Sequence, residues 1–113
     1  MASDPQYKYL RYSVESSICI LFVNREKYLN ALSIEVIEEL INFYQWTDKN
    51  KNIAVIIMTG SGNKAFIAGA DIKEMSTFSS KEAIAYALYG QSLTSYIENF
   101  PKPVIAAING FAL

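Results

Sequence analysis

The chain has 113 residues, the size of one compact domain or of part of one. Its 51% hydrophobic and 19% charged residues are typical of a globular protein and argue against disorder. The net charge of -1 arises from charges spread along the chain, so nothing indicates binding to nucleic acid or to an anionic membrane surface.

The first third of the sequence predicts a hairpin followed by a helix. Tyrosines partly alternate over residues 7–13, and an apolar, β-branched run follows over residues 18–24, which together indicate two strands. Cys19 lies inside the apolar run and is expected to be a buried, inert thiol. Ser33 can cap a helix that continues to about Thr47, because apolar residues recur there at helical spacing opposite glutamates.

The middle of the sequence predicts a parallel sheet. Residues 53–60 are apolar without alternation, which favours a strand covered on both faces. A strand, a helix and a second strand form the crossover that joins parallel neighbours. The sheet is therefore expected to be at least partly parallel.

A long helix and another strand are predicted in the last third. Ser79 and Glu82 have the spacing of a capping box, and the helix must end before Pro101. Gly90 lowers the helix propensity, so a close packing contact is expected at that position. Residues 104–108 then predict a buried strand that ends in an Asn-Gly turn.

Two loops that follow predicted strands are candidate binding segments: "TGSGNKAFIAGADIKEM" and "NGFAL". Ligands of open α/β sheets lie outside the carboxyl ends of the strands. Gly60, Gly62 and Ala65 match the spacing of a dinucleotide fingerprint, but that motif needs a helix at its third position, and residues 65–71 have no helical period. A Walker loop is excluded because Lys64 is neither preceded by glycine nor followed by serine or threonine.

The residue types and segments that the sequence lacks exclude several kinds of active site and bear on the cellular location. The chain has no histidine and one cysteine, which argues against a serine triad, a zinc site or an intrachain disulfide. No metal site is predicted. No apolar run approaches the length of a membrane span, and the first residues lack the apolar centre of a secretory signal. A cytoplasmic protein is expected, or one of the mitochondrial matrix if the chain is eukaryotic and already processed.

Three segments, in order and spacing, resemble a known family: "NREKYLNALS", "IIMTGSGNKAFIAGADIKEM" and "KPVIAAINGFAL". They are similar to the N-terminal part of the enoyl-CoA hydratase/isomerase (crotonase) family, and most closely to the enoyl-CoA hydratases. The resemblance covers residues 18–113. It implies an α/β, crotonase-like (ClpP/crotonase) fold of repeated ββα units, N-terminal half only. Residues 1–113 would then be the first portion of one domain, truncated before its glycine-rich segment and its catalytic glutamates.

The resemblance also implies roles for residues in the two loops. In this family the loop similar to "AGAD" donates a backbone N–H to the thioester carbonyl of an acyl-CoA, and the matching residue is Ala70. A second N–H comes from a glycine-rich segment after the stretch similar to "NGFAL". The residues implied to bind substrate or coenzyme A are Lys27, Tyr28, Leu29, Ala68, Gly69, Asp71, Ile72 and Lys73.

Each of these residues also has a purely structural interpretation. Residues 68–70 could form only a tight turn, and each lysine could be an ordinary solvated charge. Asp71 and Glu74 are expected to begin a short helix, where carboxylates favour the positive end of the helix dipole. Arg25 is expected to be structural.

The function implied for the complete protein is hydration of 2-trans-enoyl-CoA to 3-hydroxyacyl-CoA in fatty-acid β-oxidation. Acyl-CoA is then the substrate, with no separate cofactor, and the complete protein is implied to be a homo-oligomer, a trimer or hexamer, without nucleic-acid or membrane partners. In this family two glutamates handle the water and the α-proton, and both lie beyond the position equivalent to Leu113, so the 113-residue chain alone is expected to be nearly inactive. Two alternatives remain open: another activity of the family, such as isomerisation or acyl-CoA hydrolysis, and a non-catalytic half-domain that binds a partner segment or acyl-CoA weakly.

Overall fold

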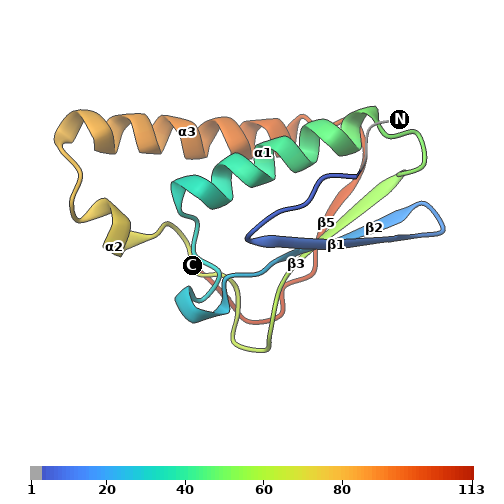
Figure 1. Cartoon of the computed structure of the whole chain (residues 1–113), viewed down its shortest axis with the longest axis horizontal. Helices are drawn as coiled ribbons and strands as arrows, with labels where there is room; N and C mark the ends of the chain where they lie inside the picture. The colour runs from blue at the N-terminus through green and yellow to red at the C-terminus, as the bar shows by residue number, and fades with distance from the viewer. Residues whose placement is uncertain (1–3) are drawn as a thin grey trace.

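The computed structural model describes residues 4–113 and consists of alternating strands and helices. In chain order the elements are β1 (Leu10–Glu15), β2 (Ile18–Val23), the 3-10 turn η1 (Glu26–Tyr28), α1 (Ile34–Lys49), β3 (Val55–Gly60), β4 (Ala65–Ile67), α2 (Ile72–Met75), α3 (Ser80–Glu98), β5 (Val104–Ala106) and β6 (Phe111–Ala112). Two strands precede each helical part, and Figure 1 shows the first pair, β1 and β2. The predicted repetition of ββα units is confirmed.

The main sheet has the strand order β1-β2-β3-β5. β1 and β2 form the predicted hairpin, although the first strand begins at Leu10 and leaves the tyrosines at positions 7 and 9 outside it. β3 runs parallel to both β2 and β5. The predicted crossover through α1 is therefore confirmed, and the carboxyl ends of β2, β3 and β5 lie at one edge of the sheet.

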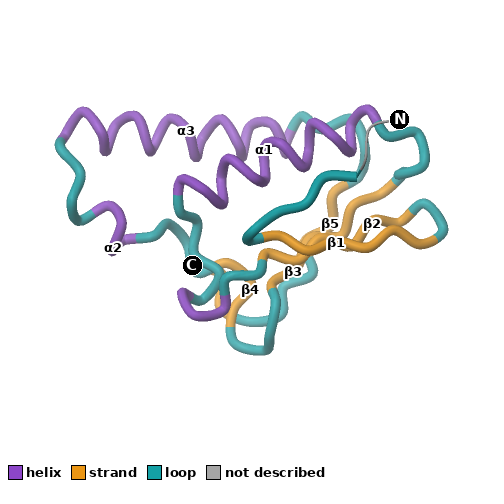
Figure 2. Tube along the Cα trace, viewed as in Figure 1, coloured by secondary structure: helices purple, strands orange, loops and turns teal. Residues whose placement is uncertain are grey.

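Two helices form a single layer over one face of this sheet (Figure 2). α1 begins where predicted, because the side chain of Ser33 accepts a hydrogen bond from the Val36 N–H. In β3, buried and half-buried residues alternate. The expectation of a strand covered on both faces was therefore wrong, since within residues 4–113 the helices cover only one side.

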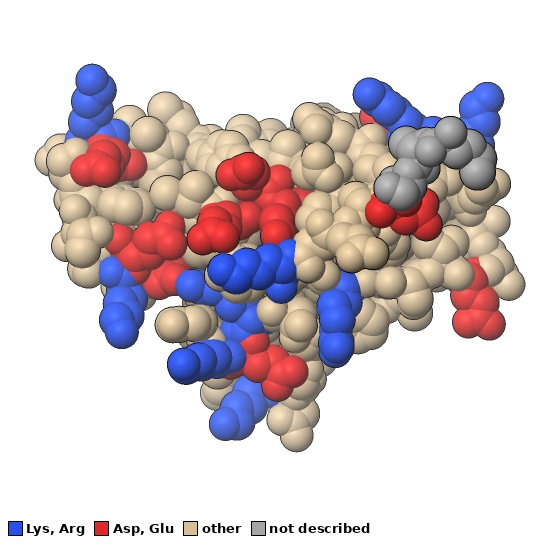
Figure 3. Space-filling view, viewed as in Figure 1, with Lys and Arg blue, Asp and Glu red and all other residues tan. Residues whose placement is uncertain are grey.

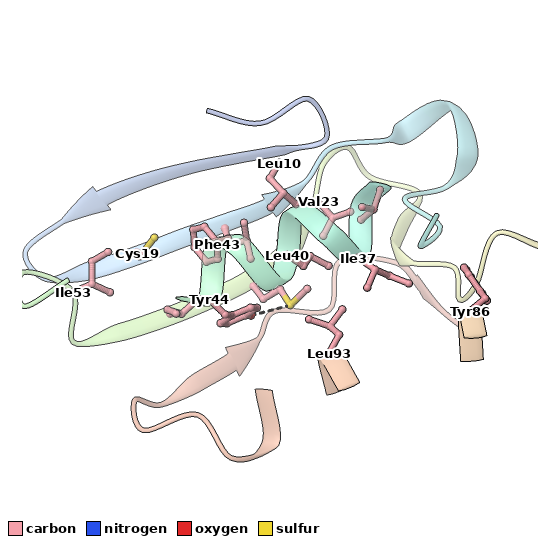
Figure 4. Packing of buried hydrophobic residues seen from close by; sticks show 14 residues of the cluster. Leu10, Cys19, Val23, Ile37, Leu40, Phe43, Tyr44, Ile53, Tyr86 and Leu93 are labelled. Carbon is pink, nitrogen blue, oxygen red and sulfur yellow. Dashed lines mark hydrogen bonds between the residues drawn. The ribbon is translucent and has the colours of Figure 1, made fainter. Parts of the chain in front are cut away.

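Helix α1 and the strands beneath it enclose the hydrophobic core (Figure 4). Tyr44 is fully buried, and its hydroxyl donates to Met58 Sδ over 3.3 Å. Cys19 is also fully buried, as expected, and burial raises the pKa of its thiol to about 11. A thiol in this state is a packing group and a poor nucleophile.

Helix α3 has the predicted capping box: the side chain of Ser79 accepts from the Glu82 N–H, and the Glu82 carboxylate accepts from the Ser79 N–H. The helix ends at Glu98, before the prolines. The close contact expected at Gly90 is absent, because a Cβ there would lie 3.9 Å from Ile37 Cδ1, an ordinary contact. Within residues 4–113 no helix is long and apolar enough to cross a membrane.

The last strands differ most from expectation. β5 lies at the edge of the main sheet, and Ile105 is 52% exposed, so the prediction of a buried strand was wrong. The predicted turn at residues 109–110 leads into β6, which pairs with β4 in a second, two-stranded parallel sheet. Neither short strand was predicted. β4 also occupies the place where a dinucleotide fingerprint would require a helix, which agrees with the rejection of that motif.

Candidate functional site

Three loops meet beyond the carboxyl ends of the parallel strands β2, β3 and β5, near the end of the chain in Figure 1. They comprise residues 24–33, residues 61–71 and residues 107–113. Hydrogen bonds join the first two loops: the Ala68 N–H donates to the Leu29 carbonyl over 3.2 Å. The Phe111 N–H donates to the Lys64 carbonyl over 3.0 Å, which joins the second loop to the third, so both candidate segments of the sequence lie at one site.

The backbone around Ala70 has a defined direction. Leu32 forms a parallel bridge with Ala70: its N–H donates to the Gly69 carbonyl over 2.8 Å, and its carbonyl accepts from the Asp71 N–H over 3.1 Å. The Gly69 carbonyl and the Ala70 N–H belong to one trans peptide group and point in opposite directions. The Ala70 N–H therefore points away from Leu32, and it donates to no group within residues 4–113.

Ala70 lines an open groove of about 400 Å³ beside the middle of α3. The remaining lining is mostly apolar or small: Leu32, Ile37, Ile67, Gly69, Met75, Tyr86, Ala87, Gly90, Gln91, Thr94 and Leu113. This lining includes no carboxylate, lysine or histidine. The groove can therefore offer apolar contact and hydrogen bonds to a ligand, and among its groups the free N–H is suited to a carbonyl oxygen.

Gly69 is required by the shape of this loop. Its φ of +83° is one that side-chain-bearing residues rarely adopt. A Cβ there would also lie 3.1 Å from the Leu113 carbonyl oxygen. The small residues of "AGA" thus allow two backbone segments to approach each other.

A charge pair also holds the loop. Arg25 Nη1 lies 2.8 Å from Asp71 Oδ2, and both side chains are about nine-tenths buried. The same nitrogen donates to the Ala31 carbonyl, and the guanidinium stacks 4.2 Å from the ring centre of Tyr28. The expectation that Arg25 is structural agrees with these contacts.

Asp71 begins α2, as expected, because its Oδ1 accepts from the Glu74 N–H over 3.0 Å. Burial raises the pKa of this carboxyl, but the Glu74 N–H and the Arg25 guanidinium outweigh burial and hold the pKa below its usual value. Both carboxylate oxygens are engaged within the protein. A substrate group that contacts Asp71 would therefore have to share a carboxylate oxygen with Arg25 or with the Glu74 N–H.

The other predicted binding residues are distributed around the site. Leu29, in the left-handed region at φ 53°, follows η1 and contacts the Ala68 segment. Lys27 borders a separate hollow of about 250 Å³ with Lys64 and Gly62. Ile72, which is 78% exposed, and Lys73 lie on α2 and border neither hollow. The structure thus brings Leu29 and residues 68–71 together, and it does not bring Lys27 and Lys73 to one cavity.

The surface over these loops carries charges of both signs. In Figure 3 several Lys and Arg side chains gather over the loops at the lower middle of the view, with acidic groups between them. The mixture of signs gives this face no large basic field.

Two asparagines that the sequence did not mark as site residues hold the loops. Asn30, buried at φ 56°, accepts from the Arg25 N–H and donates to the carbonyls of Ser61 and Ala65. Asn109 accepts from the Gly60 N–H and donates to the carbonyls of Gly60, Gly62 and Ala65. At Asn109 the Asn-Gly pair in the sequence indicated only a turn. At Asn30 the one available signal was that asparagine tolerates positive φ.

Comparisons with known proteins agree with one another. The family model described as enoyl-CoA hydratase/isomerase matches residues 13–113. The chain is 38% identical over 107 residues to a crotonyl-CoA hydratase of Syntrophomonas wolfei, covering 95% of this chain and 41% of that protein. It is 36% identical over 99 residues to a short-chain-enoyl-CoA hydratase of Clostridium acetobutylicum, covering 88% of this chain and 38% of that protein.

A solved structure gives the same result at the level of the fold. The crystal structure of an enoyl-CoA hydratase from Bacillus anthracis superposes with a TM-score of 0.90 and 34% identity, over 93% of this chain and 41% of that one. The chain thus spans well under half the length of each of these proteins.

Proposed function

Because the chain belongs to the enoyl-CoA hydratase/isomerase family, we propose that it forms the thioester-binding part of an enoyl-CoA hydratase. The reaction of the complete enzyme is the addition of water to a 2-trans-enoyl-CoA, giving a 3-hydroxyacyl-CoA, as in fatty-acid β-oxidation. The observation that carries this proposal is the free Ala70 N–H beside an apolar groove.

In this proposal the Ala70 N–H donates to the thioester carbonyl oxygen. Negative charge develops on that oxygen when water adds to the conjugated double bond, and a donor aimed at it lowers the barrier. A second N–H from a glycine-rich segment shares the charge. Within residues 4–113 the lining of the groove beside Ala70 includes no carboxylate, lysine or histidine, so proton transfer is assigned to glutamates outside these residues.

Coenzyme A is proposed to lie along the loops. Lys27, Tyr28 and Leu29 border the pantetheine and nucleotide path, and residues 68–73 border the thioester and the adenine. The thioester already activates the substrate, so the proposal needs no metal or redox cofactor. A trimer or a dimer of trimers is proposed for the complete protein only.

The test uses crotonyl-CoA labelled with ¹³C at the thioester carbonyl. A hydrogen bond to this carbonyl polarises it, so its resonance should move downfield when the ligand binds the 113-residue chain. Replacing the amide at residue 70 by an ester removes the N–H with little change of shape, and the downfield movement should then be lost. Ala70→Gly keeps the N–H and is the matched control.

Binding without any downfield movement in the wild-type chain would contradict the proposal. So would an ester variant that behaves like Ala70→Gly. Because the measurement reports on bound ligand, it does not depend on turnover by the isolated chain.

A further inference from the structure

A tyrosine from the distant helix α3 reaches the backbone bridge that orients Ala70. The hydroxyl of Tyr86 donates to the Leu32 carbonyl and accepts from the Asp71 N–H over 3.3 Å. The Asp71 N–H is at the same time 3.1 Å from the Leu32 carbonyl. The Tyr86 hydroxyl, the Leu32 carbonyl and the Asp71 N–H are therefore hydrogen-bonded to one another beside residue 70.

The rest of the tyrosine has a separate role. The ring of Tyr86 packs against Phe78, with ring centres 5.6 Å apart, and the residue is 7% exposed. Figure 4 shows Tyr86 at the end of the core cluster, apart from Phe43 and Tyr44. Packing thus accounts for the ring but does not require the hydroxyl. A phenylalanine at this position would keep the shape of the ring and lose only the hydroxyl.

The hydroxyl acts on the two hydrogen bonds that flank Ala70. The bond from Leu32 to Gly69 fixes the peptide group that contains the Ala70 N–H, and the bond from Asp71 to Leu32 fixes the next peptide group. A bridge of a single residue has no neighbouring rungs to support it, unlike the ladders of the main sheet. The direction of the Ala70 N–H therefore depends on the groups that tie Leu32 to Asp71.

We propose that Tyr86 is a positioning residue, whose hydroxyl fixes the direction in which the Ala70 N–H meets the thioester carbonyl. This inference rests on the proposed function. Tyr86 itself touches no reacting atom in this arrangement. Its effect passes through the Leu32 and Asp71 backbone.

Tyr86→Phe removes the hydroxyl, and Tyr89→Phe is the matched control on the same helix. Tyr89 is half-buried, and its hydroxyl makes no hydrogen bond within residues 4–113. The first measurement is amide hydrogen exchange of Leu32 and Asp71 without ligand. Loss of one hydrogen bond at the bridge should speed their exchange about 2-fold to 10-fold in Tyr86→Phe. The Ile56 N–H, which bonds to Pro103 within the main sheet, serves as a reference for global stability.

The second measurement is the ¹³C resonance of bound, carbonyl-labelled crotonyl-CoA at saturation. Tyr86→Phe should reduce its downfield movement, while Tyr89→Phe should match the wild-type chain. Affinity for coenzyme A without an acyl group should be equal in all three proteins. A purely structural role for the hydroxyl would not change the resonance of ligand that is fully bound.

The outcomes separate the two levels of inference. A wild-type chain that shows no downfield movement would overturn the proposed function, and this inference with it. A wild-type movement that persists unchanged in Tyr86→Phe would overturn the positioning role alone. Equal effects of Tyr86→Phe and Tyr89→Phe, or unchanged exchange of Leu32 and Asp71, would do the same.

Discussion

At the scale of single residues, the site is held by polar groups whose partners are far away in the sequence. Asp71 was expected to begin a short helix, and the bond from Glu74 confirms this. Its ion pair with Arg25 spans 46 positions and had no local signal. The roles of Asp71 and its neighbours in binding coenzyme A stay predictions.

The charge pair gives a pH dependence of stability with a definite sign. The folded-state pKa of Asp71 lies below its ordinary value of 3.8. The carboxylate therefore stabilises the fold fully above the unfolded pKa, and this stability is lost as the pH falls through the lower, folded pKa. Asp71→Asn should lower the free energy of unfolding at pH 7 by about 1–3 kcal/mol. The loss should shrink below pH 3.8, as measured by urea unfolding across the acid range.

Asp48→Asn is the control for this prediction, because Asp48 is exposed near the end of α1. Its effect at pH 7 should stay within about 0.5 kcal/mol. Parallel acid profiles of the wild-type chain and Asp71→Asn would show that the pair does not contribute as described.

At the scale of elements, the helices were predictable and the short strands were not. α1 and α3 have periodic apolar faces and capping serines, so their signals lie within the elements themselves. β4 and β6 have 3 and 2 residues, too few for any periodic pattern. They exist because Ala65 meets Phe111 across the fold. The expectation of a buried β5 failed for a related reason, since an apolar sequence does not tell which neighbour covers it.

Gly90 offers a test of helix propensity against packing. Gly90→Ala should stabilise the protein by about 0.5–1 kcal/mol, because glycine is a poor helix former and the added methyl group meets only Ile37 Cδ1 at 3.9 Å. Thermal unfolding followed by circular dichroism measures the change.

Gly60→Ala is the contrasting substitution. A Cβ at Gly60 would collide with the carbonyl oxygens of Ala65 and Phe66, so this variant should be clearly destabilised. A destabilised Gly90→Ala variant would mean that α3 packs more tightly at that point than the structure indicates.

At the scale of the whole molecule, the predicted crotonase-like fold is confirmed by its agreement with a solved enoyl-CoA hydratase. The three ordered motifs made this possible, because each corresponds to a loop of the fold. The open second face of the sheet followed from no local pattern. Apolar side chains are left exposed there, on α2 and α3, and in the loop after β5: Ile18, Ile72, Ile84, Leu88, Ile105 and Ile108.

Such surface should cause the 113-residue chain to self-associate. β5 combines an unpaired strand edge with the half-exposed Ile105, a combination that favours edge-to-edge contact. Sedimentation velocity should therefore show mass increasing with concentration, and Ile105→Lys should reduce the increase. Gln45→Lys, on the exposed side of α1, should leave it unchanged. A chain that stays monomeric throughout would contradict this expectation.

The hydrogen bonds of the Asn109 side chain have a consequence for the order in which the chain folds during synthesis. This side chain joins carbonyl groups made far earlier, and β4 acquires its partner strand only when Phe111 and Ala112 have been added. At about 5–20 residues per second, roughly 2–9 seconds of translation separate the two strands. The groups that orient the Ala70 N–H, from Leu32 to Tyr86, are all translated before β6, so the segment around β4 acquires its neighbours later than the bridge at Ala70 does.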